Sequence, residues 1–147
     1  MAVEISVPGE PQGKARPRYS GATKRVYTPA ETRQYEKLIK TLYLQKYGTA
    51  PVFPKGVALD MRITAFYAVP ASDSAGIRLK KLRGAIRPTK KPDWDNIGKI
   101  IADALNGTAY YDDAQIVDTM TRKFYSDTPR VEIKITYAGG TEHEQAP

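Results

Sequence analysis

The sequence predicts an α+β fold in which about four strands form one small mixed sheet and two main helices pack on it. Several segments alternate apolar and polar residues with the period of a strand, and two others space their apolar residues as one face of a helix does. A chain of 147 residues has a length typical of one domain, and a hydrophobic content of 41% is enough for a core.

The strands are expected near both ends of the chain and at its centre. In the first of them, Val3, Ile5 and Val7 alternate with polar residues. The predicted strands are 3–7, 57–67, 116–125 and 131–137. A turn is expected between the last two strands, which predicts that they pair as a hairpin.

The first main helix is expected over residues 29–47. Thr28 and Glu31 have the spacing of a capping box, with Pro29 at the first helical position, and Gly48 is suited to end the helix. Its apolar face is predicted to comprise Tyr35, Leu38, Ile39 and Leu42.

The second main helix is expected to start near residues 93–96 and to end at 106–107. Its apolar face is predicted to comprise Ile97, Ile100, Ile101, Ala104 and Leu105. The remaining segments are interpreted as loops: residues 8–25 are rich in Pro and Gly, and residues 68–92 form a basic insertion with a short helix at about 75–84. We expect one domain over residues 1–137 and a disordered tail over 138–147.

Composition restricts the chemistry that this chain can perform. It has no cysteine, which excludes thiolate nucleophiles and cysteine-ligated zinc, and its one histidine, His143, makes histidine-based catalytic sites improbable. If the protein is an enzyme, its chemistry must therefore come from carboxylates, lysine, tyrosine or a bound cation. The N-terminus lacks the pattern of a signal peptide and no segment has the apolar length of a membrane span, so we expect a cytoplasmic protein.

Charge is distributed unevenly along the sequence. Residues 1–92 carry 18 Lys or Arg against six Asp or Glu, whereas residues 93–118 carry six Asp against one Lys. A basic body around an acidic cluster is suited to a metal-dependent enzyme that acts on a polyanion, because basic side chains neutralise phosphates and carboxylates hold a divalent cation. The same distribution also fits a basic protein with a solvated acidic helix end.

The acidic residues form a pattern that can carry chemistry. Asp93 and Asp95 are two positions apart in an extended segment, so their side chains point to the same side. Lys99 lies one helical turn after Asp95, and the following turn is expected to return Asp113 toward them. Carboxylates this close need a cation, since like charges otherwise raise one another's pKa. A hard divalent cation prefers such oxygen ligands.

Each of these residues also has a structural interpretation. The first two aspartates fit the N-cap of a helix, and the Asp112–Asp113 pair fits a turn before a strand. Lys99 fits an ion pair with Asp95 or Asp103. Trp94 fits packing in the core or at its rim better than a platform for stacking bases.

The runs Lys91–Leu105 and Tyr111–Val117 contain the pattern D-x-D-N-x-x-K…D-A-L…D-D-x-Q-[IV]. This pattern resembles that of the RusA-type Holliday-junction resolvases. Gly13–Arg18 and Tyr27–Pro29 are also similar to versions of this family from mobile-element genomes. The resemblance spans residues 3–137.

The resemblance implies a homodimeric endonuclease that needs Mg²⁺, with Mn²⁺ as a substitute, and no small-molecule cofactor. It would cut four-way DNA junctions by paired, symmetric incisions. The catalytic residues implied are Asp93, Asp95, Lys99 and Asp113, and the metal ligands are Asp93, Asp95, Asp112 and Asp113. Contacts to DNA phosphates are expected from Lys14, Arg16, Arg18, Arg87, Lys90 and Lys91.

Two other functions fit the same residues. A non-catalytic, basic DNA-binding module would bind DNA without metal-dependent cleavage, and its aspartates would only cap a helix. A metal-dependent nuclease that acts on forks or flaps would cleave those substrates in preference to four-way junctions. Comparing cleavage of junction, fork and linear duplex separates these functions.

Overall fold

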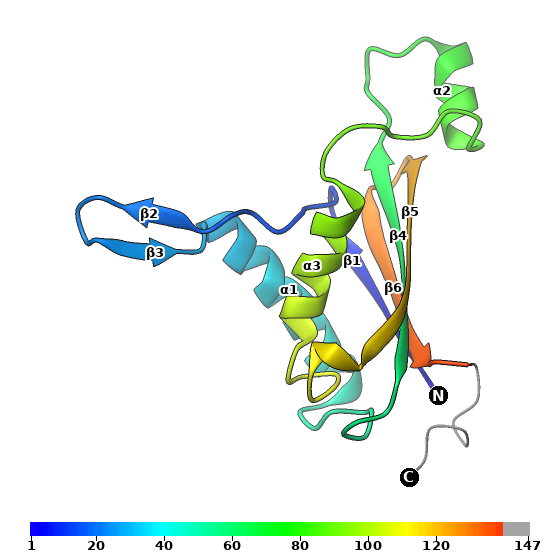
Figure 1. Ribbon diagram of the computed structural model, residues 1–147. Helices are drawn as coiled ribbons and strands as arrows, with labels where there is room; N and C mark the ends of the chain where they lie inside the picture. Colours follow the sequence, from blue (N-terminus) through cyan, green and yellow to red (C-terminus); the bar gives the residue numbers. More distant parts are fainter. Residues whose placement is uncertain (140–147) are drawn as a thin grey trace.

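The computed structural model describes residues 1–139, which form one four-stranded sheet with two long helices on one face (Figure 1). The strand order is β1-β6-β4-β5, in which β4 and β5 are parallel and the other neighbours are antiparallel. These elements are β1(Ala2–Pro8), α1(Ala30–Tyr47), β4(Leu59–Ala68), α3(Trp94–Leu105), β5(Ile116–Ser126) and β6(Arg130–Tyr137). The predicted α+β fold with a mixed sheet and two main helices is confirmed.

The core lies between the two helices and the face of the sheet that they cover. Its central strand, β4, directs every second side chain inward, because successive side chains of a strand point to opposite faces. The buried residues of β4 are Leu59, Met61, Ile63, Ala65 and Tyr67, and those of α3 are Ile97, Ile100, Ile101, Ala104 and Leu105. Burying one large apolar side chain stabilises a fold by about 1.5–3 kcal/mol. This shared core therefore determines where α3 lies over the sheet.

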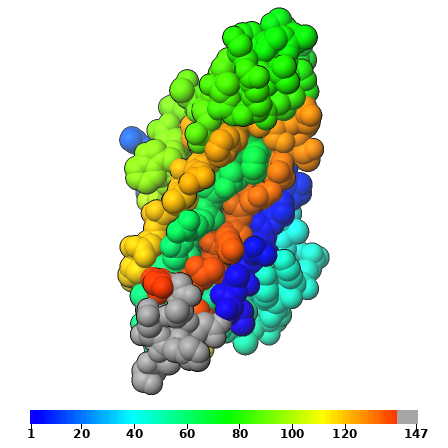
Figure 2. Space-filling view, turned by 90° about the vertical axis from the view of Figure 1, so that its right-hand side faces the viewer, coloured from blue at the N-terminus to red at the C-terminus, as the bar shows by residue number. Residues whose placement is uncertain are grey.

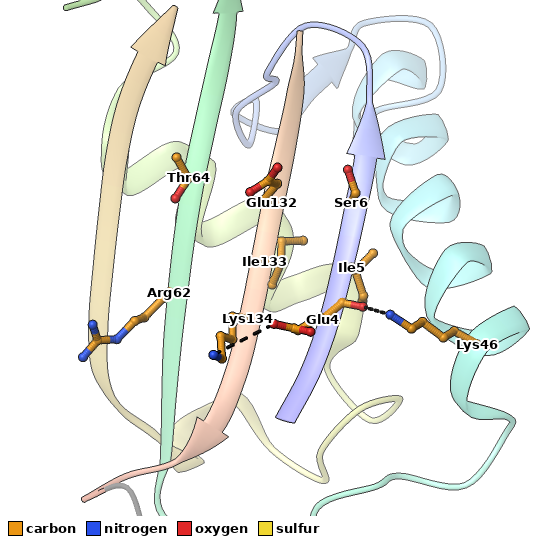
Figure 3. A pocket seen from close by; sticks show the side chains of 9 residues that line it. All are labelled: Glu4, Ile5, Ser6, Lys46, Arg62, Thr64, Glu132, Ile133 and Lys134. Carbon is orange, nitrogen blue, oxygen red and sulfur yellow. Dashed lines mark hydrogen bonds and ion pairs between the residues drawn. The ribbon is translucent and has the colours of Figure 1, made fainter. Parts of the chain in front are cut away.

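The opposite face of the sheet is open, and Figure 2 shows its four strands side by side there. A shallow depression on this face has polar side chains of both charges around it (Figure 3). Lys134 lies 3.9 Å from the carboxylate of Glu4, and Lys46 donates to the backbone oxygen of Glu4 at 2.8 Å. Charged groups of both signs therefore lie together in this depression.

The predicted hairpin of the last two strands is wrong. β4 lies between β5 and β6 and pairs with both of them. The residues that follow β5 therefore lead the chain past the end of β4 before β6 begins. β4 takes the central position because all its inward-facing residues are buried, whereas the helix-side residues Thr119 and Thr121 of β5 suit an edge strand.

A second correction concerns residues 8–25, which the sequence predicts to be loop. Two short antiparallel strands, β2(Arg18–Ser20) and β3(Arg25–Tyr27), form a hairpin that projects away from the sheet (Figure 1). We call residues 18–27 the arm. The N–H of Lys24 donates to the carbonyl of Ser20 at 2.8 Å and closes the turn. Strands of three residues are too short to show an alternation pattern, which explains the prediction of loop.

The ends of α1 agree with the sequence in one case and differ in the other. The predicted capping box is wrong, since Pro29 is the N-cap residue and no side chain forms a capping hydrogen bond. The helix therefore begins at Ala30, one residue later than predicted. Gly48 ends it as expected, with φ of +84° and an N–H that donates to the carbonyl of Leu44 at 2.9 Å.

The basic segment 68–92 contains the predicted short helix, α2(Ala75–Leu82), which stands beyond one end of the sheet (Figure 1). No residue of α2 is buried. Ion pairs join Arg78 to Asp127 and Lys81 to Asp73, so charge contacts rather than a core hold this helix.

Within residues 1–139 no helix has the length and apolar character needed to cross a lipid bilayer. The tail predicted over residues 138–147 falls mostly on residues 140–147, which lie outside the described part of the chain. Ala138 itself is buried, and its N–H donates to the carbonyl of Ala58 at 2.9 Å, so the ordered domain extends past residue 137.

The segment that precedes the arm is locked against the start of α3. The N–H of Lys14 donates to the carbonyl of Asn96 at 2.9 Å. A Cβ atom added to Gly13 would lie only 2.9 Å from the Cβ atoms of Asn96 and Pro92. Glycine at position 13 therefore allows the backbone to approach the end of α3 that carries the first aspartates.

We predict that Gly13→Ala lowers the free energy of unfolding by about 1–3 kcal/mol, because the new methyl group overpacks this contact. The shift of the urea midpoint measures the effect. Gly76→Ala in α2 is the matched control, since nothing lies within 4 Å of an added Cβ there. The control should be neutral or stabilising by up to about 1 kcal/mol. An unchanged midpoint for Gly13→Ala would contradict the proposed close contact.

Candidate active site

The first turn of α3 presents the first two aspartates of the motif. Asp93 is the N-cap residue, and its carbonyl accepts the N–H of Ile97 at 3.1 Å, but its side chain makes no capping hydrogen bond. The N-cap interpretation therefore accounts for the backbone of Asp93 and not for its carboxylate. Asp95 and Lys99 are exposed, on the side of α3 away from its buried apolar face.

A buried tyrosine positions the backbone that leads to Asp93. Tyr67, on the central strand β4, is 1% exposed, and its hydroxyl donates to the carbonyl of Pro92 at 2.8 Å. Burial raises the pKa of Tyr67, and the nearby charges of Glu10 and Asp93 raise it further. The hydroxyl therefore stays protonated and keeps this hydrogen bond at any pH near neutrality.

A groove of about 310 Å³ between α3 and the edge strand β5 brings Asp95, Lys99 and Asp113 together. We call it the α3–β5 groove. Its base is apolar, because the buried side chains of Met61 and Ile63 lie beneath it. The other lining residues are Trp94, Gly98, Ala102, Ile116, Thr119 and Thr121.

Two side chains of this groove differ from their structural interpretations. Lys99 forms no ion pair with Asp95, Asp103 or any other acidic residue of the described chain, although Asp103 does pair with Lys14. Trp94 is 65% exposed, so it lies at the edge of the groove and outside the core. Both side chains are thus available to a ligand in the groove.

A buried glutamine holds the turn that carries Asp113. Gln115 is 8% exposed, and its side-chain nitrogen donates to the carbonyls of Pro54 and Val57, each at 3.0 Å. Its side-chain oxygen accepts the N–H groups of Tyr111 and Asp112, each at 3.1 Å. These bonds fasten the turn to the segment before β4. The sequence patterns assigned no role to this residue, although the Asp-x-x-Gln spacing of a capping box marks it.

Asp112 has a structural role at this turn. Its side chain accepts the N–H of Ala114 at 3.0 Å and, with Gln115, forms a capping box around the short 3₁₀ helix η1(Asp113–Gln115). Its side chain lines a separate depression beside Lys55 and Tyr111. The turn interpretation therefore describes Asp112 well.

The structure does not place all four predicted metal ligands in one cavity. Asp95 and Asp113 line the α3–β5 groove, whereas Asp93 lines an adjoining depression with Gly13 and Lys91. Among residues 1–139, no group of three or more acidic or histidine side chains is arranged to hold a metal ion. The groove thus contains two of the predicted carboxylates and the predicted lysine.

Asp113 is held among negative charges. Its N–H donates to the side-chain oxygen of Asn106, which follows α3, at 3.0 Å. Desolvation raises the pKa of Asp113, and a hydrogen bond with Asp112 and the charges of Asp112 and Asp103 raise it further. Ionisation of this carboxylate is therefore opposed by its surroundings in the metal-free protein.

Of the predicted phosphate contacts, Lys14 is the most engaged within the protein. Its ammonium group lies 3.2 Å from carboxylate oxygens of both Glu36 on α1 and Asp103 on α3, and its side chain is 19% exposed. Desolvation lowers the pKa of Lys14, but the two carboxylates outweigh it and the net shift is upward. Lys14 thus joins the two helices, which is the role of a structural ion pair.

The other predicted phosphate contacts are exposed. Arg16 leads into the arm, Arg18 lies on it, and Lys90 and Lys91 precede α3. Arg87 is held in place, because its guanidinium lies 3.8 Å from the centre of the Phe124 ring and its Nε donates to the carbonyl of Lys123 at 2.7 Å. Lys90 and Lys91 place positive charge beside the start of α3, whereas Arg87 lies on the open face of the sheet, because Phe124 stacks on Phe66, which points away from the helices.

A basic α+β domain with two aspartates and a lysine in one groove has the charge distribution of an enzyme that acts on nucleic acid. The family model described as "Endodeoxyribonuclease RusA" matches residues 8–136. The chain therefore belongs to the RusA family of endodeoxyribonucleases, and both the family and the enzyme class predicted from the sequence are confirmed.

Two relatives are similar to this chain. An uncharacterised protein of Bacillus subtilis (strain 168), YqaN, is 34% identical over 135 residues, which cover 90% of this chain and 94% of that protein. The crossover junction endodeoxyribonuclease rusA of Lactococcus phage r1t is 34% identical over 94 residues, which cover 63% of this chain and 65% of the phage protein.

The raised pKa of Asp113 predicts a pH-dependent effect of Asp113→Asn on the metal-free protein. At pH 7 the wild-type carboxylate is ionised against its neighbours, so the variant should melt at a higher temperature. At a pH well below the ordinary value of 3.8 the carboxyl is neutral in both the folded and the unfolded state, and the difference should vanish. Thermal melts in EDTA at both pH values measure this.

Asp118→Asn makes the same charge change at an exposed position of β5 outside the α3–β5 groove and serves as the control. Its effect should lie within about 0.5 kcal/mol at either pH. A lower melting temperature for Asp113→Asn at pH 7 would contradict the electrostatic interpretation.

Proposed function

We propose that this endodeoxyribonuclease resolves four-way DNA junctions by Mg²⁺-dependent hydrolysis of phosphodiester bonds. The observation that carries the proposal is the α3–β5 groove, where Asp95, Lys99 and Asp113 line one cavity of a domain with a net charge of +7. The name of the phage r1t relative, a crossover junction endodeoxyribonuclease, supports a junction as the substrate.

The donor chemistry of the groove fits a hard divalent cation. Asp95 and Asp113 supply carboxylate oxygens from its two sides, and Mg²⁺ and Mn²⁺ prefer such ligands. Desolvation, a hydrogen bond with Asp112 and the charges of Asp112 and Asp103 raise the pKa of Asp113, and a bound cation would favour its ionised form. Asp93, whose side chain makes no capping bond, would complete the ligand set. One carboxylate oxygen of Asp112 accepts the N–H of Ala114 and so helps to place Asp113. Only its other carboxylate oxygen would be available as a metal ligand.

When bound, Mg²⁺ would acidify a water molecule and neutralise the phosphate that it attacks. Lys99 would hold a fixed positive charge in the same groove and stabilise the charge that develops on the phosphoryl oxygens. The apolar base formed by Met61 and Ile63 excludes water beneath these groups, which strengthens their electrostatic interactions.

DNA would be positioned by exposed basic side chains near the start of α3, on the arm and, for Arg87, on the open face of the sheet. The exposed residues proposed for contacts to phosphates are Arg16, Arg18, Arg87, Lys90 and Lys91. Lys14 would instead join α1 to α3 through its ion pairs with Glu36 and Asp103. A two-fold dimer of the chain would present this surface to two strands of a two-fold junction, and paired, symmetric incisions would follow from that symmetry.

We predict that Asp95→Asn and Asp113→Asn each reduce cleavage of a four-way junction at least about a hundredfold, since each removes a metal ligand. Binding to the same junction in EDTA should stay at or above the wild-type level, because no phosphate contact is lost. Gel-shift and cleavage assays on one set of variants measure both quantities. Asp118→Asn should cleave as the wild type does. Full activity in Asp113→Asn would end the proposed mechanism.

The same assays separate the other functions. Cleavage of forks or flaps in preference to junctions would favour the fork nuclease, and binding without any metal-dependent cleavage would favour the non-catalytic module.

The salt dependence of binding should separate Lys91 from Lys14. Each phosphate contact contributes about −0.9 to the slope of log K against log salt for duplex DNA. Lys91→Ala should therefore make the slope shallower by about that amount with no change in stability. Lys14→Met should leave the slope unchanged and lower stability by about 1–2 kcal/mol. Anisotropy titrations and urea unfolding measure both, and equal slope changes would contradict this division.

A further inference from the structure

The arm has two chemically different faces. In its register Arg18 pairs with Tyr27, Tyr19 with Val26, and Ser20 with Arg25. Cross-strand partners share a face and successive residues alternate between faces. Tyr19 and Val26 therefore form one apolar face, and the residues of the other, cationic face are Arg18, Ser20, Arg25 and Tyr27.

The apolar face of the arm is unusually exposed. Tyr19 is 65% exposed and Val26 is 69% exposed, and the arm projects from the body of the domain (Figure 1). An isolated two-stranded hairpin is at best marginally stable in water. An exposed apolar pair on such a hairpin contributes little within the chain, which points to a partner that covers it.

The charge of the arm selects the kind of partner. No acidic residue occurs from Pro11 to Ala30, and the basic residues in this stretch are Lys14, Arg16, Arg18, Lys24 and Arg25. A second arm would bring like charges together, whereas a polyanion would neutralise them. Nucleic acid also offers an apolar surface wherever its bases are unstacked, since every base has a face on which an aromatic ring can stack.

We propose that the arm binds at the branch point of the DNA, with Tyr19 and Val26 against unstacked bases and Arg18 and Arg25 on the flanking phosphates. This inference rests on the proposed junction substrate and adds a second contact region outside the α3–β5 groove. Stacking of the duplex arms is interrupted at the branch point. Apolar side chains can therefore contact the bases there with a smaller loss of base-stacking energy than elsewhere in the DNA.

The attachment of the arm ties it to the active site. Lys14 lies four residues before Arg18, where the arm begins, and its N–H donates to the carbonyl of Asn96 in the first turn of α3. Gly13 packs on the same turn. A branch point held by the arm would therefore lie at a defined distance from the α3–β5 groove, which would select the phosphate that is cut.

The test compares junction and linear duplex as binding partners in EDTA, so that cleavage plays no part. The double variant Tyr19→Ser, Val26→Ser should bind the junction about tenfold or more weakly, since stacking one base on an aromatic ring is worth about that factor. Its affinity for duplex should be unchanged. Tyr19→Phe keeps the ring and should bind as the wild type does. Leu79→Ser, at a residue of α2 that is 59% exposed, is the matched control and should also bind normally.

A fluorescent base, 2-aminopurine, placed at the branch point reports stacking directly. At saturating protein the wild type should change its fluorescence, and the double variant should not. A second variant, Arg18→Gln with Arg25→Gln, should weaken junction and duplex alike. Equal melting temperatures for all variants would show that the arm has been changed without unfolding the domain.

Three results would overturn the inference. One is unchanged junction affinity in the double variant, and another is an equal loss for junction and duplex. The third is a change in oligomeric state, measured by light scattering, because the apolar faces would then pair between two copies of the chain. Since none of these measurements needs cleavage, the inference can fail while the nuclease proposal stands. Absence of junction cleavage by the wild type would end that proposal without deciding the role of the arm.

Discussion

The packing of α3 on the central strand of the sheet is the constraint on which the rest of the structure depends. One face of this helix is buried to the level of 0–7% exposure, so the helix cannot rotate without opening the core. Asp95 and Lys99 must then face the edge strand β5, where they form one side of the α3–β5 groove. The position of the chemical groups is thus a consequence of hydrophobic burial on the other face of the same helix.

The second side of the groove depends on polar burial. Asp113 follows α3 in a turn that has no helical apolar face to pack on the core. The side-chain amide of Gln115 holds that turn to the segment before β4 through four hydrogen bonds. A buried amide with all these bonds satisfied is rigid, because breaking one of them leaves an unpaired polar group. The turn is therefore stiff enough to hold Asp113 beside Asp112 and Asp103 although their charges raise its pKa. An arrangement that strains a carboxylate in this way is typical of a functional site.

The parts of the fold that were predictable from sequence are those with a long apolar period. The apolar face of α3 and the alternation in β4 decided both elements, and burial confirms them. The pairing of β5 with β4 was not predictable, because a short turn predicts a hairpin locally and only the burial of β4 on its inner face places that strand between the other two. The arm escaped prediction for the opposite reason, since it has no core to produce a pattern.

For the site, the spacing of Asp95 and Lys99 was informative, because residues four apart in a helix lie on the same face. Asp112 and Asp93 show the limit of this reasoning, since adjacent or alternate positions in a turn do not determine which cavity a carboxylate enters. Lys14 shows a further limit. Its position in a basic stretch predicts a phosphate contact, yet Glu36 and Asp103 come from two distant parts of the sequence to surround it. Net charge along a sequence therefore overstates the charge that a folded surface offers to DNA, and the exposed cations, not the paired ones, determine where a polyanion binds.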